Sequence, residues 1–297
     1  MAKGIYTGIG SIRKVKKIYV GVNGVAHKVK QVYVGVNGTV KPIWILATDG
    51  QQIFTSSGTF VVPDGVHKVD IFCVGGGGKA GKSRKGRYDV VYAGGGGGAG
   101  GYTTTMLGVE LSSASYPVTV GASGGVSSFG TLCRAEPGGD GANYGNYSSS
   151  HGDPNARPVR AGGAGGIGGS GGGAAGFYFD EDEESGFQQP TPGASNGGTA
   201  NNAITNTESV HCVMGGTGQG RTTRAFGEAA GTLYSPGSGG KSQSGVAAGM
   251  GAGVTGPNSG SGNSENTNIY TEKNDTYYET TTGYSGIVIV RWKADEQ

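Results

Sequence analysis

This sequence has few hydrophobic residues, little net charge and no long apolar run. Hydrophobic residues make up 34% of the 297 residues, charged residues make up 15%, and the formal net charge is +2. So weak a charge does not point to nucleic acid or an anionic membrane as a partner. No stretch contains the roughly eighteen consecutive apolar residues of a membrane-spanning helix. We therefore expect neither a nucleic-acid partner nor membrane insertion.

Proline is scarce as well, with 10 residues, while glycine contributes 65. Collagen would need glycine at every third position together with abundant proline. Here the glycines come in separate blocks, which excludes collagen. A glycine share so far above the usual value of roughly 7% also limits the size of a conventional hydrophobic core.

Cysteine and histidine are few and scattered. Cys73, Cys133 and Cys212 lack the close spacing of a zinc site or a disulfide framework, and free cysteines of this kind are usually buried and reduced. The four histidines lie in four different segments with no i, i+4 pair. These patterns predict no metal, no cofactor and no enzymatic activity. The first residues also lack the apolar stretch of a signal peptide, so we expect synthesis in a reducing cytosol.

The first segment contains an internal repeat. Val15-Lys-Lys-Ile-Tyr-Val-Gly-Val-Asn-Gly24 recurs fourteen residues later as Val29-Lys-Gln-Val-Tyr-Val-Gly-Val-Asn-Gly38. Each copy alternates as a strand does and ends in Asn-Gly, the strongest short-range signal for a type I′ hairpin turn. We predict a small β-meander over residues 15–46. Because such a small sheet is marginally stable in water, we expect copies of itself or another structural protein to cover it.

Short strands alternate with glycine blocks in the rest of the chain. Gly58-Thr-Phe-Val-Val-Pro-Asp-Gly65 and Val66-His-Lys-Val-Asp-Ile-Phe-Cys-Val74 are typical of strand, turn and strand. Further strands are predicted at residues 90–92, 101–106, 116–120, 128–133, 210–214 and 286–292. No stretch has a helical period. We predict an all-β fold with an N-terminal β-hairpin repeat segment, residues 1–48, and a β-sandwich-like domain, residues 49–297.

One glycine block has a strict period of three. In Gly162-Gly-Ala-Gly-Gly-Ile-Gly-Gly-Ser-Gly-Gly-Gly173 the third positions are Ala164, Ile167 and Ser170. Three is the period of a polyproline II helix, and two of its faces here carry no side chain. Neighbouring helices could then approach closely and pair their backbone groups laterally. We predict packed polyglycine II helices beside the sheets, with flexible Gly/Ser linkers as the alternative.

A nucleotide-binding spacing also occurs after a predicted strand, in Gly76-Gly-Gly-Lys-Ala-Gly81-Lys82-Ser83. Phosphate binding would need a helix that starts near Lys82. The following residues include Gly86, continue with β-branched residues and end in another glycine block. A chance match is expected in so glycine-rich a chain, and we predict no bound nucleotide.

Aromatic residues within polar segments are candidates for recognition. Tyrosine with Ser, Gly and Asn is the composition of adaptable binding loops. The residues we predict to bind a receptor are Tyr144, Tyr147, His151, Phe177, Tyr178, Phe179, Tyr277 and Tyr278. Alternatively, some of these rings cap the glycine bundle or the sheets. The run Asp180-Glu-Asp-Glu-Glu184 is expected to form a solvated or partner-facing loop, with cation binding and catalysis as alternatives.

Several segments resemble one family of proteins. The units Tyr19-Val-Gly-Val-Asn-Gly24 and Tyr33-Val-Gly-Val-Asn-Gly38, followed by Trp44, resemble repeats in tail proteins of phages and prophages of Gram-positive bacteria. The segment from Phe54 to the glycines at 75–78 resembles the opening of glycine-rich domains in phage tail fibres. Tyr284-Ser-Gly-Ile-Val-Ile-Val-Arg-Trp292 is similar to the end of such domains. The charged insert at residues 79–89 departs from the pattern because it interrupts the first glycine run.

The resemblance implies a phage tail fibre or receptor-binding adhesin located in the virion. Residues 1–48 would attach it to other tail proteins, and residues 49–297 would bind a glycan or protein on the host bacterial surface. The resemblance further implies a homotrimer, although related adhesin tips are single chains. A purely structural tail or baseplate component and a depolymerase of envelope polysaccharide are the alternatives.

Overall fold

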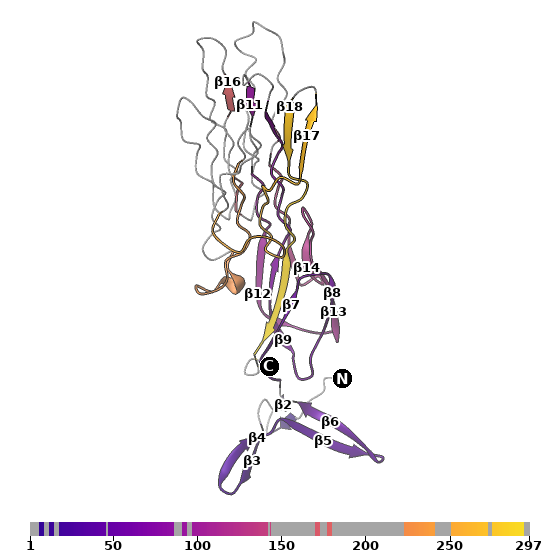
Figure 1. The fold of residues 1–297 in the computed structure, drawn as a ribbon. Helices are drawn as coiled ribbons and strands as arrows, with labels where there is room; N and C mark the ends of the chain where they lie inside the picture. The colour runs from indigo at the N-terminus through magenta and orange to yellow at the C-terminus, as the bar shows by residue number, and fades with distance from the viewer. Residues whose placement is uncertain are drawn as a thin grey trace.

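The computed structural model describes residues 6–8, 12–14, 18–45, 47–85, 91–93, 97–141, 143, 170–172, 177–179, 223–240, 251–272 and 275–293. Within these residues the regular elements are β-strands and one short 3₁₀ helix, which confirms the all-β prediction. Small hairpins lie at one end, a β-sandwich follows, and glycine-rich segments run side by side from the sandwich to a distal sheet at the opposite end (Figure 1).

The two repeats form two equivalent hairpins. Strand β3 (Tyr19–Val22) pairs with β4 (Val25–Lys28), and β5 (Gln31–Val36) pairs with β6 (Thr39–Ile45). A shorter pair, β1 (Tyr6–Gly8) and β2 (Ile12–Lys14), precedes them. Both residues of each Asn-Gly turn have positive φ, 52° and 77° in the first and 50° and 74° in the second. The predicted type I′ turns are therefore confirmed.

The predicted meander is wrong, because each hairpin is a separate two-stranded sheet. Strands β4 and β5 are linked by Val29 and Lys30, which include neither glycine nor asparagine. A two-residue hairpin turn needs positive φ, which β-branched residues adopt only with strain. The Val29 N–H instead donates to the Ile18 carbonyl at 2.8 Å, which closes the first hairpin on itself.

Two four-stranded antiparallel sheets form the sandwich. The first has the order β12-β9-β19-β7 and contains β7 (Gly50–Phe54), β9 (Lys68–Val74), β12 (Thr103–Glu110) and β19 (Ile287–Trp292). The second has the order β15-β14-β13-β8 and contains β8 (Gly58–Val61), β13 (Ser115–Thr119), β14 (Ser127–Phe129) and β15 (Cys133–Ala135). The predicted strand at 128–133 is thus two strands, divided by a turn at Gly130 with φ +50°.

Aromatic residues from both sheets fill the space between them. Phe60 and Phe129 are fully buried, with ring centroids 5.5 Å apart, and Tyr116 stacks on Phe129 at 5.1 Å. Strand β9 is buried on both faces. Its opposite face places Phe72 against Phe226, which lies in the 3₁₀ helix η1 (Ala225–Gly227). The segment around η1 therefore covers the outer face of the first sheet.

A cluster of charged residues joins the segment around η1 to the first sheet. The Arg291 Nε donates to Asp70 Oδ2 at 3.0 Å, its Nη2 lies 2.8 Å from Glu228 Oε1, and its Cζ lies 3.8 Å from the Phe226 ring centroid. Arg291 and Asp70 are largely buried, while the Glu228 side chain is 53% exposed. Arg291 thereby ties η1 to the first sheet.

This cluster predicts a small loss of stability in acid. The hydrogen bond from Arg291 and its charge lower the pKa of Glu228. A lowered folded-state pKa stabilises the fold above the ordinary Glu pKa of about 4.3, and this contribution disappears as the pH falls below that value. In Glu228→Gln the unfolding free energy should fall less between pH 7 and pH 3 than in wild type. The difference should be well under 1 kcal/mol, because the carboxylate is mostly exposed. Urea unfolding of wild type and variant at pH 7 and pH 3 measures the effect; an equal pH dependence in both would contradict it.

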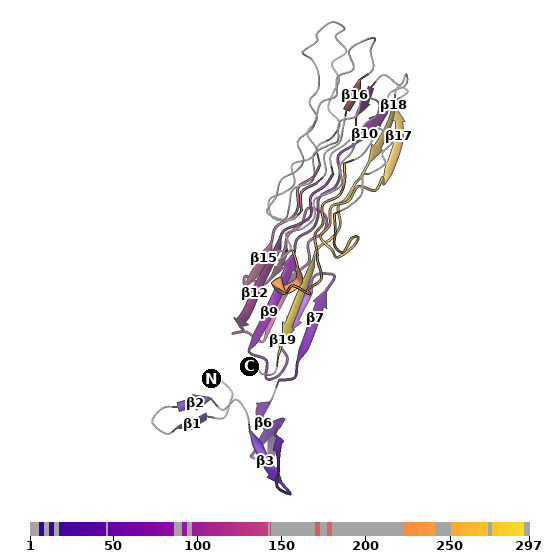
Figure 2. The ribbon, with the colours of Figure 1, turned by 90° about the vertical axis from the view of Figure 1, so that its left-hand side faces the viewer.

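Beyond the sandwich, glycine-rich segments extend its strands into a bundle (Figure 2). Residues 75–80 continue β9, residues 97–102 lead into β12, residues 136–141 follow β15 and residues 281–286 lead into β19. The segments 121–125, 170–172, 235–240 and 259–264 also belong to it. We call these eight segments the glycine bundle.

Lateral hydrogen bonds in the glycine bundle repeat every third residue. Gly75 and Gly78 both donate to segment 97–102, at 2.9 and 2.8 Å, while the two glycines between them donate to two other segments. Segment 97–102 behaves in the same way, since Ala99 and Tyr102 both donate to segment 136–141. Segments 75–80 and 97–102 thus each donate to three neighbours in turn, as a polyglycine II helix should. The predicted packing is confirmed for these segments, and the linker alternative fails for them.

The block in which the period is clearest, Gly162 to Gly173, falls mostly outside the described residues. Its described part, 170–172, does belong to the glycine bundle. Ser170 accepts from Gly100 at 2.9 Å through its carbonyl and donates its N–H to Ser235 at 3.3 Å.

Candidate functional site

A five-stranded antiparallel sheet, the distal sheet, stands at the far end of the glycine bundle (Figures 1 and 2). Its order is β16-β11-β10-β18-β17. The strands are β10 (Ser83–Lys85), β11 (Val91–Ala93), β16 (Phe177–Phe179), β17 (Asn268–Glu272) and β18 (Asp275–Glu279). The charged insert at 79–89 thus leaves residues 75–80 in the bundle and supplies the central strand of the distal sheet.

The distal sheet contains five of the eight residues that were predicted to bind a receptor. Phe177, Tyr178 and Phe179 form β16, and Tyr277 and Tyr278 lie on β18. The loops expected at these positions are therefore strands. Aromatic and β-branched residues favour strands when an antiparallel partner is present, and β11 and β17 are those partners. Tyr144, Tyr147 and His151 lie outside the described residues, as do Cys212, the strand expected at 210–214 and the acidic run at 180–184.

Two tyrosines on neighbouring strands stack on each other. Tyr270 on β17 is paired with Tyr277 on β18, and their ring centroids are 5.0 Å apart with an interplanar angle of 20°. The Lys82 Nζ lies 6.0 Å from the Tyr270 centroid and 3.1 Å from Glu279 Oε1. The hydrogen bond from Lys82 to Glu279 raises the pKa of Lys82, so this ammonium stays charged. Since Tyr277 and Glu279 are two residues apart on one strand, they share a face of the sheet.

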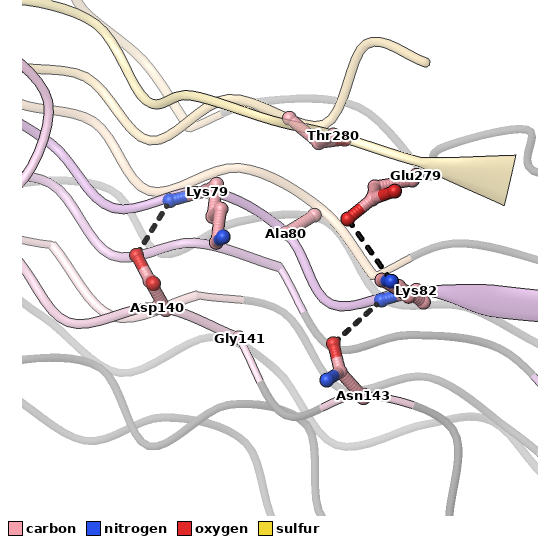
Figure 3. A pocket seen from close by; sticks show the side chains of 8 residues that line it. All are labelled: Lys79, Ala80, Lys82, Asp140, Gly141, Asn143, Glu279 and Thr280. Atoms are coloured by element: carbon pink, nitrogen blue, oxygen red, sulfur yellow. Dashed lines mark hydrogen bonds and ion pairs between the residues drawn. The ribbon is translucent and has the colours of Figure 1, made fainter. Parts of the chain in front are cut away.

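A polar cavity of about 240 Å³ lies where the glycine bundle meets the distal sheet (Figure 3). It is lined by Lys79, Ala80, Lys82, Asp140, Gly141, Asn143, Glu279 and Thr280. Backbone hydrogen bonds hold two of the lining side chains. The Lys79 N–H donates to Asp140 Oδ1, and the Lys82 N–H donates to Asn143 Oδ1, each at 3.0 Å.

The cavity offers hydrogen-bond donors and acceptors with no net formal charge. Two lysines oppose one aspartate and one glutamate, and Asn143 adds an amide. Such a surface suits an uncharged ligand rich in hydroxyl groups better than an anion or a cation. Through Lys82 and Glu279 the cavity adjoins the tyrosine stack.

Lys79 and Lys82 were noted only within the nucleotide-binding spacing and the charged insert, and the cavity itself was not predicted, because only the fold brings its residues together. Lys79 and Lys82 follow one glycine run, whereas Asp140 and Asn143 follow Gly138 and Gly139. Polar residues that come directly after a glycine run were the available signal. Such polar residues mark where the segments leave the glycine bundle.

The nucleotide-binding spacing has a different structure from a phosphate loop. Strand β10 begins at Ser83, where a phosphate site would need a helix. The backbone N–H groups of Gly76, Gly77, Gly78 and Ala80 all donate to carbonyls of neighbouring bundle segments. These groups are therefore already used within the bundle.

Among the described residues, no group of three His, Cys, Asp or Glu side chains is placed to hold a metal ion. No helix in the same part of the chain is long and apolar enough to cross a membrane.

Fold and site together define a class: an all-β protein in which a polyglycine II bundle joins a β-sandwich to a distal sheet beside a polar cavity. The chain belongs to the glycine-rich domain family, whose model matches residues 55–293. The matched region covers nearly all of the sandwich, the glycine bundle and the distal sheet, and leaves out the N-terminal hairpins. No curated protein matches the chain.

Proposed function

We propose that this protein is the receptor-binding adhesin of a phage tail fibre, and that it recognises a glycan on the host bacterial surface with its distal end. The observation that carries the proposal is the arrangement of the two ends. Exposed apolar hairpins lie at one end and the distal sheet lies at the other, with the sandwich and the laterally bonded glycine bundle between them (Figure 2). The distal sheet carries the tyrosine stack, and the polar cavity lies where this sheet meets the bundle.

The hairpin end has the surface of an attachment module. Tyr19, Val25 and Val40 are all more than half exposed, and Val40 reaches 69%. An apolar surface of this kind is expected to be covered by another protein. We assign that role to other tail proteins, in keeping with the resemblance of the repeats to phage tail sequences.

The distal end has features that favour a glycan over a protein surface. A stacked pair of aromatic rings supplies an apolar platform with a polar rim, and the adjoining cavity presents both donors and acceptors. A sugar ring has one apolar face and a belt of hydroxyl groups. The stacked tyrosines would contact the apolar face of the sugar, and the cavity would hydrogen-bond to its hydroxyl groups.

We further propose a homotrimer whose contacts lie at the hairpins. The described glycine segments pair laterally within one chain, so the bundle needs no second chain to satisfy its backbone. Most of the exposed large hydrophobic side chains among the described residues lie on the hairpins.

A pair of variants tests the binding site. We expect Tyr277→Ala to weaken binding of the fluorescently labelled protein to a susceptible Gram-positive strain by about tenfold or more, since loss of an aromatic anchor costs at least roughly 1.4–2 kcal/mol. Ile269→Ala is the matched control. Ile269 is 59% exposed, and it precedes Tyr270 on β17, so its side chain lies on the opposite face.

Soluble wall polysaccharide from the same strain should compete with the wild-type protein for the cells. Equal binding by both variants would contradict the assigned site. Competition by surface protein alone would contradict the glycan. A wild-type protein that assembles into tails but binds no susceptible strain would indicate the purely structural alternative.

A further inference from the structure

Two cysteine side chains meet in the core of the sandwich. Cys73 lies on β9 of the first sheet and Cys133 begins β15 of the second, and both are buried in one hydrophobic cluster. Their thiols lie close enough for each to shift the pKa of the other. Cys73 is paired with Thr104, whose carbonyl oxygen lies 3.8 Å from Cys133 Sγ. The Cys133 thiol therefore reaches across the sandwich to the strand pair that contains Cys73.

We propose that Cys73 and Cys133 form a disulfide that joins the two sheets when the protein meets an oxidising environment. A disulfide needs side chains that face each other across a short gap. Two buried thiols in one cluster, with Cys133 Sγ beside the cross-strand partner of Cys73, meet this condition with little movement of the backbone. The pair lies within the sandwich, so the inference does not depend on the proposed receptor binding.

A small-molecule disulfide such as oxidised glutathione is the oxidant. One cysteine thiolate attacks a sulfur of that disulfide, forms a mixed disulfide and releases one small thiol. The second cysteine attacks the mixed disulfide, releases the other small thiol and leaves the Cys73–Cys133 bond. Two electrons pass to the oxidant, and the two cysteine protons end on the two released thiols.

Cys133 is the residue that reacts first. It lies on a three-residue strand at the edge of its sheet, directly after the turn at 130–132, whereas Cys73 lies in a seven-residue strand with a partner on each side. Short edge strands open locally more easily than central ones. The proximity of the two thiols acts in the same direction, since it lowers the pKa of Cys133 and raises that of Cys73.

The test compares the full chain made in bacteria with an oxidising cytoplasm and in ordinary bacteria. Both preparations carry Cys212→Ser, so that the only thiols are Cys73 and Cys133. We expect a cross-linked Cys73–Cys133 peptide and no alkylation under denaturing conditions in the oxidised protein, and two alkylated cysteines in the reduced one. Closing a long loop should raise the Tm of the oxidised protein by roughly 5–10 °C, and dithiothreitol should reverse the rise.

Cys133→Ala in the same background is the matched control, because it keeps Cys73 but removes the partner. Its Tm should be the same with and without dithiothreitol. Two fully alkylated cysteines in the protein from the oxidising cytoplasm would overturn the proposal. A cross-linked protein whose Tm falls below that of the reduced form would overturn the stabilising role of the bond.

Discussion

Replacing Gly77 by alanine should destabilise the glycine bundle by on the order of 4 kcal/mol, which is an exceptional cost for a single methyl group. A Cβ at this position would lie 1.9 Å from the Ser261 carbonyl oxygen and 2.4 Å from its carbon. Both contacts are with backbone of a neighbouring segment, so no side chain can rotate away. Relief would require the two segments to separate, and their lateral hydrogen bonds would break with them.

Gly35→Ala is the control for this substitution. Gly35 lies in hairpin strand β5, has no positive φ, and a Cβ there would meet no atom within 4 Å. Urea unfolding followed by tyrosine and tryptophan fluorescence should show a much lower midpoint for Gly77→Ala and an unchanged midpoint for Gly35→Ala. Equal midpoints for Gly77→Ala and wild type would mean that the segments are not in close lateral contact.

Truncation of Phe129 should cause a comparable loss, about 3–5 kcal/mol. The ring is fully buried between the two sheets, where it contacts Phe60 and stacks on Tyr116. Phe129→Ala removes this burial and leaves a cavity that strands held in hydrogen-bonded register cannot close. The same urea unfolding experiment measures the loss.

Val61→Ala is the matched control, because Val61 lies in the same sheet with 66% of its surface exposed. Its unfolding free energy should change by less than about 0.5 kcal/mol. Similar losses for the two variants would contradict the assignment of Phe129 to the core.

Local chemistry explains which parts of the fold the sequence could predict. The Asn-Gly turns and the alternating strands of the sandwich depend on neighbouring residues, and the structure has them close to the expected positions. A period of three in a glycine run indicates a polyproline II-like conformation of that run, so polyglycine II packing was also predictable. Which segment bonds to which was not, because segments without side chains carry no pattern that selects a partner.

Local sequence patterns do not predict the distal sheet. Strands β10 and β17 come from a charged insert and a segment rich in Thr and Asn, whose compositions resemble loops. They become strands because the glycine bundle delivers them side by side, with β18 between them. Tyr277 was among the aromatic residues predicted to bind a receptor, but its stacking partner and the cavity depend on these long-range pairings.

The glycine bundle also makes the proposed adhesin rigid. Sheet strands enter the bundle at one end and the distal sheet leaves it at the other, and lateral hydrogen bonds link the described segments between them. A binding site carried in this way keeps a fixed position relative to the sandwich. Preorganisation of this kind lowers the entropic cost of binding.

Amide hydrogen exchange in segments 75–80 and 97–102 tests the central claim most directly. If these glycine-rich segments are bonded laterally, their amides should exchange orders of magnitude more slowly than those of an unstructured peptide, although no helix or sheet contains them. Exchange of Gly76, Gly77 and Gly78 as fast as in a free peptide would contradict the bundle and the rigid adhesin built on it.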